Sequence, residues 1–225
     1  MLKTMQRRTL CLAPLSLLAA CATPPAAAPS DLWFILLEAG RPTPPDKAAV
    51  AAMQTGHIDN FKRLFAQGRL LAAGPLSDPG GPRRGIVVVR ADSLAMLTGY
   101  FEPDTYVREG HMTLNARRAV AHRPLHTEGI DASRIEEVRI VLIGRPAGPD
   151  PSADRRSALL RGLVDAGRLG AWYTLADGPV AEVLLARGTD SAALQSALAP
   201  YADAGPAVRV EVLRQWIAPG VVGPR

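Results

Sequence analysis

Residues 61–70 of the chain read FKRLFAQGRL, and residues 160–169 read LRGLVDAGRL, so two similar stretches lie 99 residues apart. In each stretch apolar residues recur three and four positions apart and a glycine follows, as at the C-terminal end of an amphipathic helix. The same shift places Asp78 over Asp177. Similarity at a fixed spacing is typical of a repeated structural unit. We therefore interpret the chain as two divergent copies of one module, a prediction that depends on the order of elements more than on identity.

The first copy, residues 31–122, is predicted to follow the order strand, helix, strand, strand, helix, strand. Residues 32–37 form a continuous apolar run, which is typical of a strand covered on both faces. Asp46 follows two prolines and suits the N-cap of the first helix, and Gly68 suits its end. The remaining elements are expected as strands at 70–76, 85–90 and 112–120 and a helix at 93–101.

The second copy, residues 138–217, is predicted to repeat this order after a connector at 123–137 and to be followed by a C-terminal tail at 218–225. Its strands are expected at 138–143, 169–175, 180–187 and 207–216, and its helices at 154–165 and 191–201. Two βαββαβ units are ferredoxin-like modules, each with one sheet face left open by its helices. We therefore predict an α+β fold in which two antiparallel sheets pack face to face as an intramolecular, pseudo-dimeric α/β barrel.

The motif residues of the first copy resemble the YciI-like (YCII-related) family of dimeric α/β-barrel proteins. The resemblance is carried by His57, by residues 68–78 (GRLLAAGPLSD), by the strand at 85–90 and by residues 103–110 (PDTYVREG). It covers residues 32–122 well and the second copy faintly. Because relatives build their barrel by dimerising, two fused copies imply a monomeric pseudo-dimer.

His57 is the main candidate for chemistry, because it lies on the apolar face of the first helix, four residues from both Met53 and Phe61. The resemblance implies that His57 and Asp78 pair at a pocket and form the active site. A carboxylate on one ring nitrogen fixes the tautomer and leaves the other nitrogen free to move a proton. The alternatives are a structural histidine and a carboxylate that only forms the Asp-Pro-Gly-Gly turn.

Two further residues of the first copy are candidates for substrate binding. Tyr106 offers a phenol and Arg108 a guanidinium that could bind an anion, although both are equally compatible with packing or surface roles. In the second copy Arg156 stands where His57 stands in the first, opposite Asp177. An Arg–Asp pair cannot exchange protons near neutral pH, so this site is expected to be structural or to bind an anion.

The N-terminus is typical of an export signal. Lys3, Arg7 and Arg8 precede a short apolar stretch that ends in Leu-Ala-Ala-Cys at Cys21, which resembles the lipobox of bacterial lipoproteins. We therefore predict a signal peptide at 1–20, lipidation of Cys21 and an Ala/Pro-rich tether over the rest of 21–30. The resemblance implies a lipid-anchored protein of the bacterial cell envelope, at the periplasmic face of the outer membrane because Ala22 follows the cysteine.

Removal of this signal changes the meaning of the composition. Loss of Lys3, Arg7 and Arg8 lowers the formal net charge from +5 to +2, so the basic pI does not indicate nucleic-acid binding. Only Cys21 stays, as the anchor, which excludes disulfides and a thiol nucleophile. No Walker, Rossmann or Gly-x-Ser-x-Gly motif is present. His122 and His126 flank Pro124 in the connector, so neither a metal nor a cofactor is expected.

The sequence supports two functions of different classes. The first is an envelope-anchored protein that binds a small organic molecule, whose identity stays open, and that works as a cofactor-free enzyme through a His57–Asp78 acid/base pair. Isomerase, lyase and hydrolase reactions all suit such a pair. The second is a non-catalytic periplasmic binding, scaffold or assembly protein that keeps the fold without the chemistry.

Overall fold

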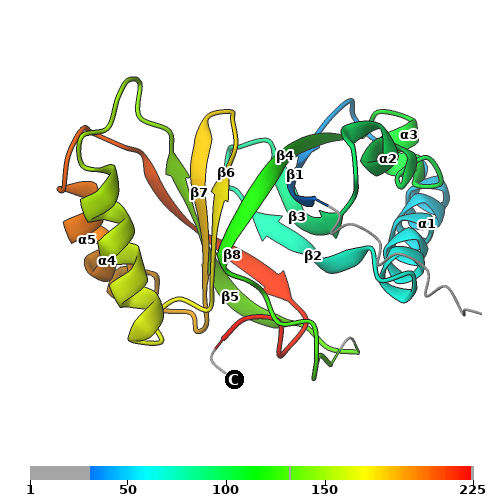
Figure 1. Ribbon diagram of the computed structural model, residues 1–225. Helices are drawn as coiled ribbons and strands as arrows, with labels where there is room; N and C mark the ends of the chain where they lie inside the picture. Colours follow the sequence, from blue (N-terminus) through cyan, green and yellow to red (C-terminus); the bar gives the residue numbers. More distant parts are fainter. Residues whose placement is uncertain (1–30, 132, 224–225) are drawn as a thin grey trace, which may run out of the picture.

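The computed structural model describes residues 31–131 and 133–223, and within them eight antiparallel strands close into one barrel that carries helices on two opposite sides (Figure 1). The first half of the chain contains β1 (Leu32–Ala39), α1 (Lys47–Ala66), β2 (Leu70–Ser77), β3 (Arg83–Arg90), α2 (Leu94–Gly99), α3 (Thr105–Arg108) and β4 (Met112–Arg123). The second half contains β5 (Glu136–Gly144), α4 (Ala153–Asp165), β6 (Ala171–Leu175), β7 (Val180–Ala186), α5 (Ser191–Ala202) and β8 (Val210–Ile217).

The strand order around the barrel is β1-β3-β2-β8-β5-β7-β6-β4. Each half contributes four neighbouring strands in matching order, β4-β1-β3-β2 and β8-β5-β7-β6, as two ferredoxin-like sheets would. The halves are joined where β2 pairs with β8 and where β4 pairs with β6. The predicted α+β pseudo-dimeric barrel is confirmed, with the addition that the two sheets are hydrogen-bonded edge to edge.

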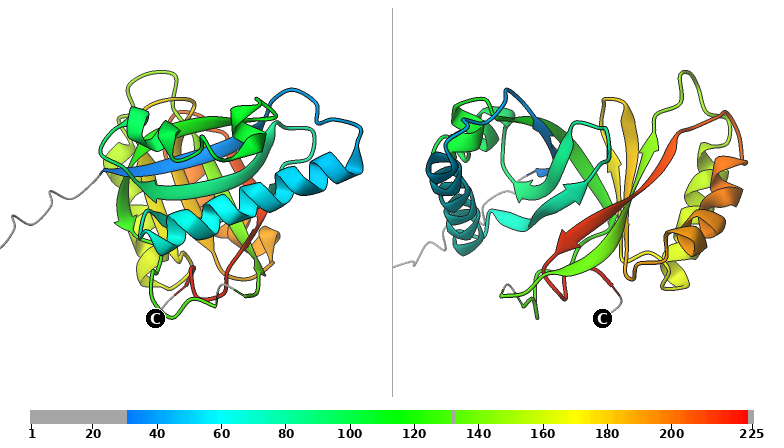
Figure 2. Two further views of the ribbon diagram at one scale, coloured as in Figure 1. Left: turned by 90° about the vertical axis from the view of Figure 1, so that its right-hand side faces the viewer. Right: turned by 180° about the vertical axis from the view of Figure 1, so that it is seen from behind.

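The helices cover the outer face of each sheet, with α1, α2 and α3 on one side of the barrel and α4 and α5 on the other (Figure 2). Asp46 caps α1 as predicted, since its carboxylate accepts a hydrogen bond from the Ala48 N–H. Gly68 and Gly167 follow α1 and α4 with φ of 66° and 68°, a conformation that glycine adopts without strain. The C-terminal ends of α1 and α4, which the sequence places 99 residues apart, therefore share the same glycine conformation.

The barrel interior is an apolar core to which both halves contribute. Phe34 of β1 and Tyr173 of β6 are almost fully buried there, with ring centroids 5.8 Å apart. One further apolar cluster lies between the first sheet and its helices, and another lies between the second sheet and its helices. Because the central cluster needs side chains from both sheets, neither half buries its open face alone.

Several boundaries differ from the expected ones. Strand β4 continues to Arg123 because its last residues pair with β6, so the connector between β4 and β5 is shorter than predicted. The second helix of the first half ends at Gly99 and is followed by the separate turn of α3. In the C-terminal tail, Val221 and Val222 pack into the barrel core. The predicted signal, Cys21 and the tether lie outside the described residues.

In the part of the chain that the structure describes, no helix combines the length and the apolar character needed to cross a membrane.

Candidate functional site

His57 lies on the buried stripe of α1, between Met53 and Leu64. Its ring centroid is 4.4 Å from that of Phe61 and 5.6 Å from that of Tyr106, which meets the imidazole edge-on. Only 7% of the residue is exposed. The helical spacing that singled out His57 in the sequence therefore places it in a mostly apolar setting under α1.

The partner of His57 is Asp104, directly before α3. Its Oδ2 is 2.6 Å from His57 Nδ1, and its Oδ1 accepts a hydrogen bond of 3.0 Å from the backbone N–H of Tyr106. The Asp104 side chain is fully buried. A carboxylate can only accept, so the hydrogen bond assigns the proton to Nδ1 and leaves Nε2 with its lone pair in the neutral ring.

The predicted His57–Asp78 pair is wrong. Asp78 lies in the turn after β2, where its carboxylate accepts a hydrogen bond of 2.7 Å from Arg83 Nε. Arg83 also pairs with Glu211 of β8 at 2.9 Å. Burial acts to lower the pKa of Arg83, but the hydrogen bonds to Glu211 and Asp78 outweigh it and leave that pKa raised. Asp78 therefore holds Arg83, and Arg83 in turn joins the first half to Glu211 of the second.

Asp104 belongs to the motif PDTYVREG that carried the family resemblance, yet sequence reasoning overlooked it as the partner of His57. One local signal was available, because an aspartate two residues before Tyr106 suits the N-cap of a helical turn. A cap places its carboxylate at a fixed point. The return of this loop to α1, however, depends on tertiary packing and not on local sequence.

A cavity of about 390 Å³ opens beside His57. Its polar walls come from Gln54, His57 and Arg84, and Trp216 of β8 brings a contribution from the second half. The rest of the lining is apolar or backbone: Leu37, Ile58, Phe61, Ala73, Gly74, Pro75, Gly85, Ile86, Met112 and Ile135. Within the described residues His57 Nε2 has no hydrogen-bond partner, and this atom is not fully buried. It is therefore the nitrogen available to a ligand in this cavity.

The two predicted substrate-binding residues have different places. Tyr106 is buried against the His57 ring, with its hydroxyl 3.5 Å from the Val50 carbonyl, and does not line the cavity. Arg108 is exposed and donates to the Thr105 hydroxyl at 3.1 Å, also outside the cavity lining. The guanidinium in the cavity wall is that of Arg84, which sequence reasoning did not select.

The second half lacks a matching acid/base pair at this position. Arg156 is buried at the place of His57, but it pairs with Asp150 at 2.9 Å and donates to the Pro206 carbonyl. Asp177 instead pairs with Arg117 at 2.6 Å. The expected Arg156–Asp177 pair is therefore wrong, because a carboxylate in the loop before α4 lies closer to Arg156.

The predicted connector histidines do not lie in a metal-binding group. His122 is on β4, where its Nε2 is 2.8 Å from Thr174 Oγ1 and its ring stacks on Trp172. Among residues 31–131 and 133–223 no three His, Cys, Asp or Glu side chains gather as metal ligands would.

The fold and site together define a class, the dimeric α/β-barrel proteins in a single-chain form, with a buried His–Asp pair in the first half. Residues 33–120 match the family model of the YCII-related domain. The first half is therefore similar to the YCII-related domain, in agreement with the resemblance carried by its motifs. No functionally curated protein matches the sequence.

Solved structures share the whole barrel. A protein of Lactobacillus acidophilus assigned as a monooxygenase superposes with a TM-score of 0.53 at 9% identity, covering 87% of this chain and 100% of that chain. One of Fusobacterium nucleatum, assigned likewise, gives 0.53 at 7% identity, with 88% and 98% covered. A mutant chlorite dismutase of Candidatus Nitrospira defluvii, in complex with cyanide, gives 0.53 at 12% identity, with 84% and 92% covered. At these identities the similarity establishes the fold alone.

Proposed function

We propose that the protein binds small organic acids in the His57 cavity and acts on them as a cofactor-free acid/base enzyme of the isomerase, lyase or hydrolase type. The observation that carries this proposal is the buried 2.6 Å contact between His57 and Asp104 at the wall of a cavity of about 390 Å³. A cavity with apolar walls and a few convergent polar groups is the usual form of a small-molecule site.

The preference for an acid follows from Arg84. Its guanidinium donates to the carbonyl oxygens of Gly81 and Arg83, and no carboxylate of the described residues lies within ion-pair distance. Among residues 31–131 and 133–223, no carboxylate therefore neutralises its positive charge. A guanidinium presents a planar set of donors that matches a carboxylate, so an anionic ligand would complete this wall of the cavity.

His57 is suited to moving a proton of such a ligand. With Nδ1–H held by Asp104, Nε2 takes a proton from the substrate or from a bound water, and the imidazolium formed is stabilised by the adjacent carboxylate. The same nitrogen then returns the proton to the product. Phe61 and Trp216 line the cavity, and their apolar surfaces would limit the access of water during this exchange.

A thermal-shift screen tests ligand binding. Small carboxylic acids, halogenated acids and the matched neutral amides would be added to the wild type, to Arg84→Ala and to the control Arg155→Ala on the exposed face of α4. A ligand that binds the native state raises its stability by about 2.7 kcal/mol at a hundredfold excess over Kd. We expect the acids alone to act, more weakly on Arg84→Ala and unchanged on Arg155→Ala. Equal shifts with all three proteins would contradict the proposed site.

Turnover of an acid found in this screen separates enzyme from binder. General acid/base catalysis contributes about 10²- to 10⁴-fold, so His57→Ala should lose turnover by that factor while still binding the acid. Unchanged turnover would disprove catalysis by His57. Binding without any turnover would leave the second candidate, a non-catalytic binding protein of the envelope.

We also propose that the chain is anchored in the cell envelope through lipidated Cys21, at the periplasmic face of the outer membrane. The support is the basic, apolar and small-residue pattern that ends at this cysteine. Radiolabelled palmitate should be incorporated into the wild type and not into Cys21→Ala, and only the wild type should sediment with outer membranes. An unlabelled wild-type protein would refute the anchor.

A further inference from the structure

We propose that the His57 cavity continues into a second cavity that holds an apolar tail, so that the preferred ligand is a monocarboxylic acid with an aliphatic chain of medium length. This inference rests on the proposed function, because it assumes that the acid group binds near His57 and Arg84. It adds the substrate class that the first cavity alone does not define.

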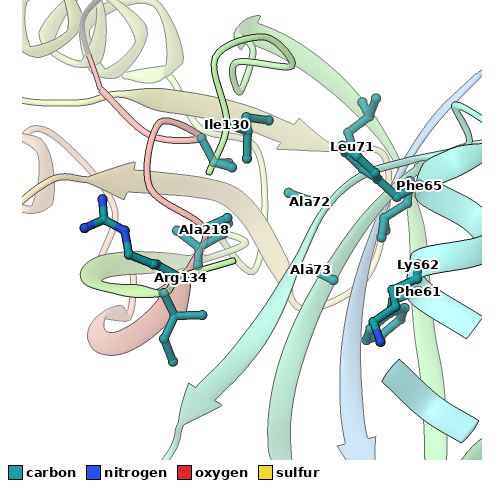
Figure 3. A pocket seen from close by; sticks show the side chains of 13 residues that line it. Phe61, Lys62, Phe65, Leu71, Ala72, Ala73, Ile130, Arg134 and Ala218 are labelled. Carbon is teal, nitrogen blue, oxygen red and sulfur yellow. The ribbon is translucent and has the colours of Figure 1, made fainter. Parts of the chain in front are cut away.

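The second cavity has a volume of about 220 Å³ and lies between the C-terminal part of α1, β2 and the segments before β5 and after β8 (Figure 3). Its walls are mostly apolar, as a hydrocarbon chain requires. The lining residues that it does not share with the His57 cavity are Lys62, Phe65, Leu70, Leu71, Ala72, Ile130, Arg134, Ile217, Ala218 and Val221.

The two cavities are neighbours. Phe61, Ala73 and Ile135 line both of them. The Phe61 ring centroid is 4.4 Å from that of His57, so a side chain that lines both cavities lies directly beside the imidazole. A ligand whose acid group lies near His57 can therefore extend past Phe61 into the apolar space.

The cationic side chains of the two cavities determine which end of the ligand lies in which cavity. Lys62 and Arg134, the cations of the second cavity, are each paired with a carboxylate three residues away, at 3.2 Å from Asp59 and 2.7 Å from Asp131. Arg84, in the first cavity, has no such partner among the described residues. The anionic end is therefore attracted to Arg84, and the tail is left for the second cavity.

In the second half of the molecule, a large side chain stands at the position that corresponds to Ala73 in the second cavity. At the position 99 residues after Ala73 stands Trp172, which faces α4 and α5 and is buried. Its ring stacks on His122 with centroids 4.0 Å apart, and its Nε1 donates to Glu182. The small side chain of Ala73 leaves in the first half the space that an indole fills in the second.

Calorimetric titration with unbranched acids from four to ten carbons tests the tail cavity. Each methylene buried in the cavity should tighten binding about fourfold until the space is full. Ala218→Phe adds bulk to the second cavity only and should abolish this gain while leaving the affinity for butanoate unchanged. The matched control is Ala199→Phe on the exposed face of α5, which should behave as the wild type.

A second variant tests the tail cavity in case Ala218→Phe does not fold. Phe65 is 47% exposed and lines only the second cavity, so Phe65→Asp should fold normally and weaken the longer acids at least tenfold without weakening butanoate. Val120→Asp, at a residue 63% exposed that lines neither cavity, is its control. If butanoate binds and longer acids bind no more tightly, the tail cavity is wrong and the proposed function stands. If no acid binds to the wild type, the proposed function fails, and this inference with it.

Discussion

Asp104 performs two tasks with one carboxylate: Oδ1 caps α3, and Oδ2 holds His57. The cap fixes the carboxylate relative to the backbone, and the buried ring is then fixed relative to the carboxylate. A catalytic imidazole needs such support, because its reactive nitrogen must point in one direction. The residue that sequence reasoning chose, Asp78, has an equally well-defined role elsewhere, as a partner of Arg83, which links β3 to Glu211 of β8.

The double role of Asp104 predicts a large loss of stability on its removal. Asp104→Ala deletes a helix cap, worth about 1 kcal/mol, and leaves buried His57 Nδ1 without a partner, which costs about 1–3 kcal/mol more. We expect urea unfolding at pH 7 to show a loss of about 2–4 kcal/mol. Asp46→Ala, which removes only the cap of α1, should cost about 1 kcal/mol. Equal losses in the two variants would contradict the paired role of Asp104.

Glu182 predicts a pH dependence. Burial raises the pKa of its carboxyl, and the hydrogen bonds from Trp172 and Thr174 offset this only in part. The carboxyl of Glu182 therefore stays protonated to a higher pH in the folded protein than in the unfolded chain. As the pH rises from the unfolded pKa through the folded pKa, ionisation of Glu182 lowers the free energy of unfolding. Glu182→Gln should gain stability over the wild type between pH 4 and 7, whereas Glu102→Gln, an exposed control, should not. The measurement is urea unfolding at several pH values in this range. A difference in unfolding free energy between Glu182→Gln and the wild type that does not change with pH would overturn this explanation.

At the scale of elements, the critical contacts are the two places where the halves join. The β2–β8 pairing has only two residue pairs in register, Leu76 with Gln215 and Ser77 with Arg214. Side chains extend it, because Arg83 of β3, held by Asp78 of its own half, pairs across the junction with Glu211 of β8. On this side, an ion-pair cluster thus supports barrel closure in addition to the backbone hydrogen bonds.

Removal of Arg83 should therefore weaken the closed barrel. Arg83→Ala leaves the carboxylates of Asp78 and Glu211 together without their shared cation, at an expected cost of about 1–3 kcal/mol. The neighbouring Arg84→Ala removes an exposed guanidinium that pairs with no carboxylate in the described part of the chain, and it should change stability by less than about 0.5 kcal/mol. Calorimetric melting of both variants checks this, and similar melting temperatures would argue against the cluster as a structural junction.

Most of the elements could be predicted because their signals are local. The apolar run at 32–37, the cap at Asp46 and the glycine at Gly68 each act within a few residues, and the structure has β1 and both ends of α1 where they indicated. The end of β4 was missed because Arg123 finds its partner, Trp172, in the other half. Such pairing depends on barrel closure, which no local pattern records.

The candidate site was predictable only in part, for the same reason. His57 could be found from the helical period, since a buried position on α1 follows from spacing alone. The choice between Asp78 and Asp104 required knowledge of which loop returns to α1. Arg84 was missed because it is a candidate only through its lack of a carboxylate partner among the described residues. That property belongs to the folded molecule and cannot be read from the sequence.

At the scale of the whole molecule, one chain completes a barrel whose interior needs both sheets. The central apolar cluster mixes residues of the two halves, such as Ile86 and Ile140. The site shares this dependence, because Trp216 of the second half lines the cavity beside His57. The second half therefore contributes to the candidate site even though its own equivalent of the histidine is an arginine.

This architecture predicts a monomer that unfolds as one unit. The chain from Pro24 onward should elute with the mass of a single copy in light scattering and melt in one transition whose calorimetric and van't Hoff enthalpies agree. Two separate transitions would mean that the halves are stable independently. A tight dimer that buries the open sheets between chains would contradict closure within one chain.

The central claim, that Asp104 holds His57 so that Nε2 is free for a ligand, is tested most directly by ¹⁵N NMR of histidine-labelled protein, with the His57 signals assigned from a His57→Gln variant. We predict that the neutral ring carries its proton at Nδ1 and not at Nε2. Asp104→Asn should alter this pattern, since its amide can cap α3 while donating to Nδ1, and Asp78→Asn should leave it unchanged. A neutral ring that carries its proton at Nε2 in the wild type, or a pattern that responds to Asp78 and not to Asp104, would contradict the account.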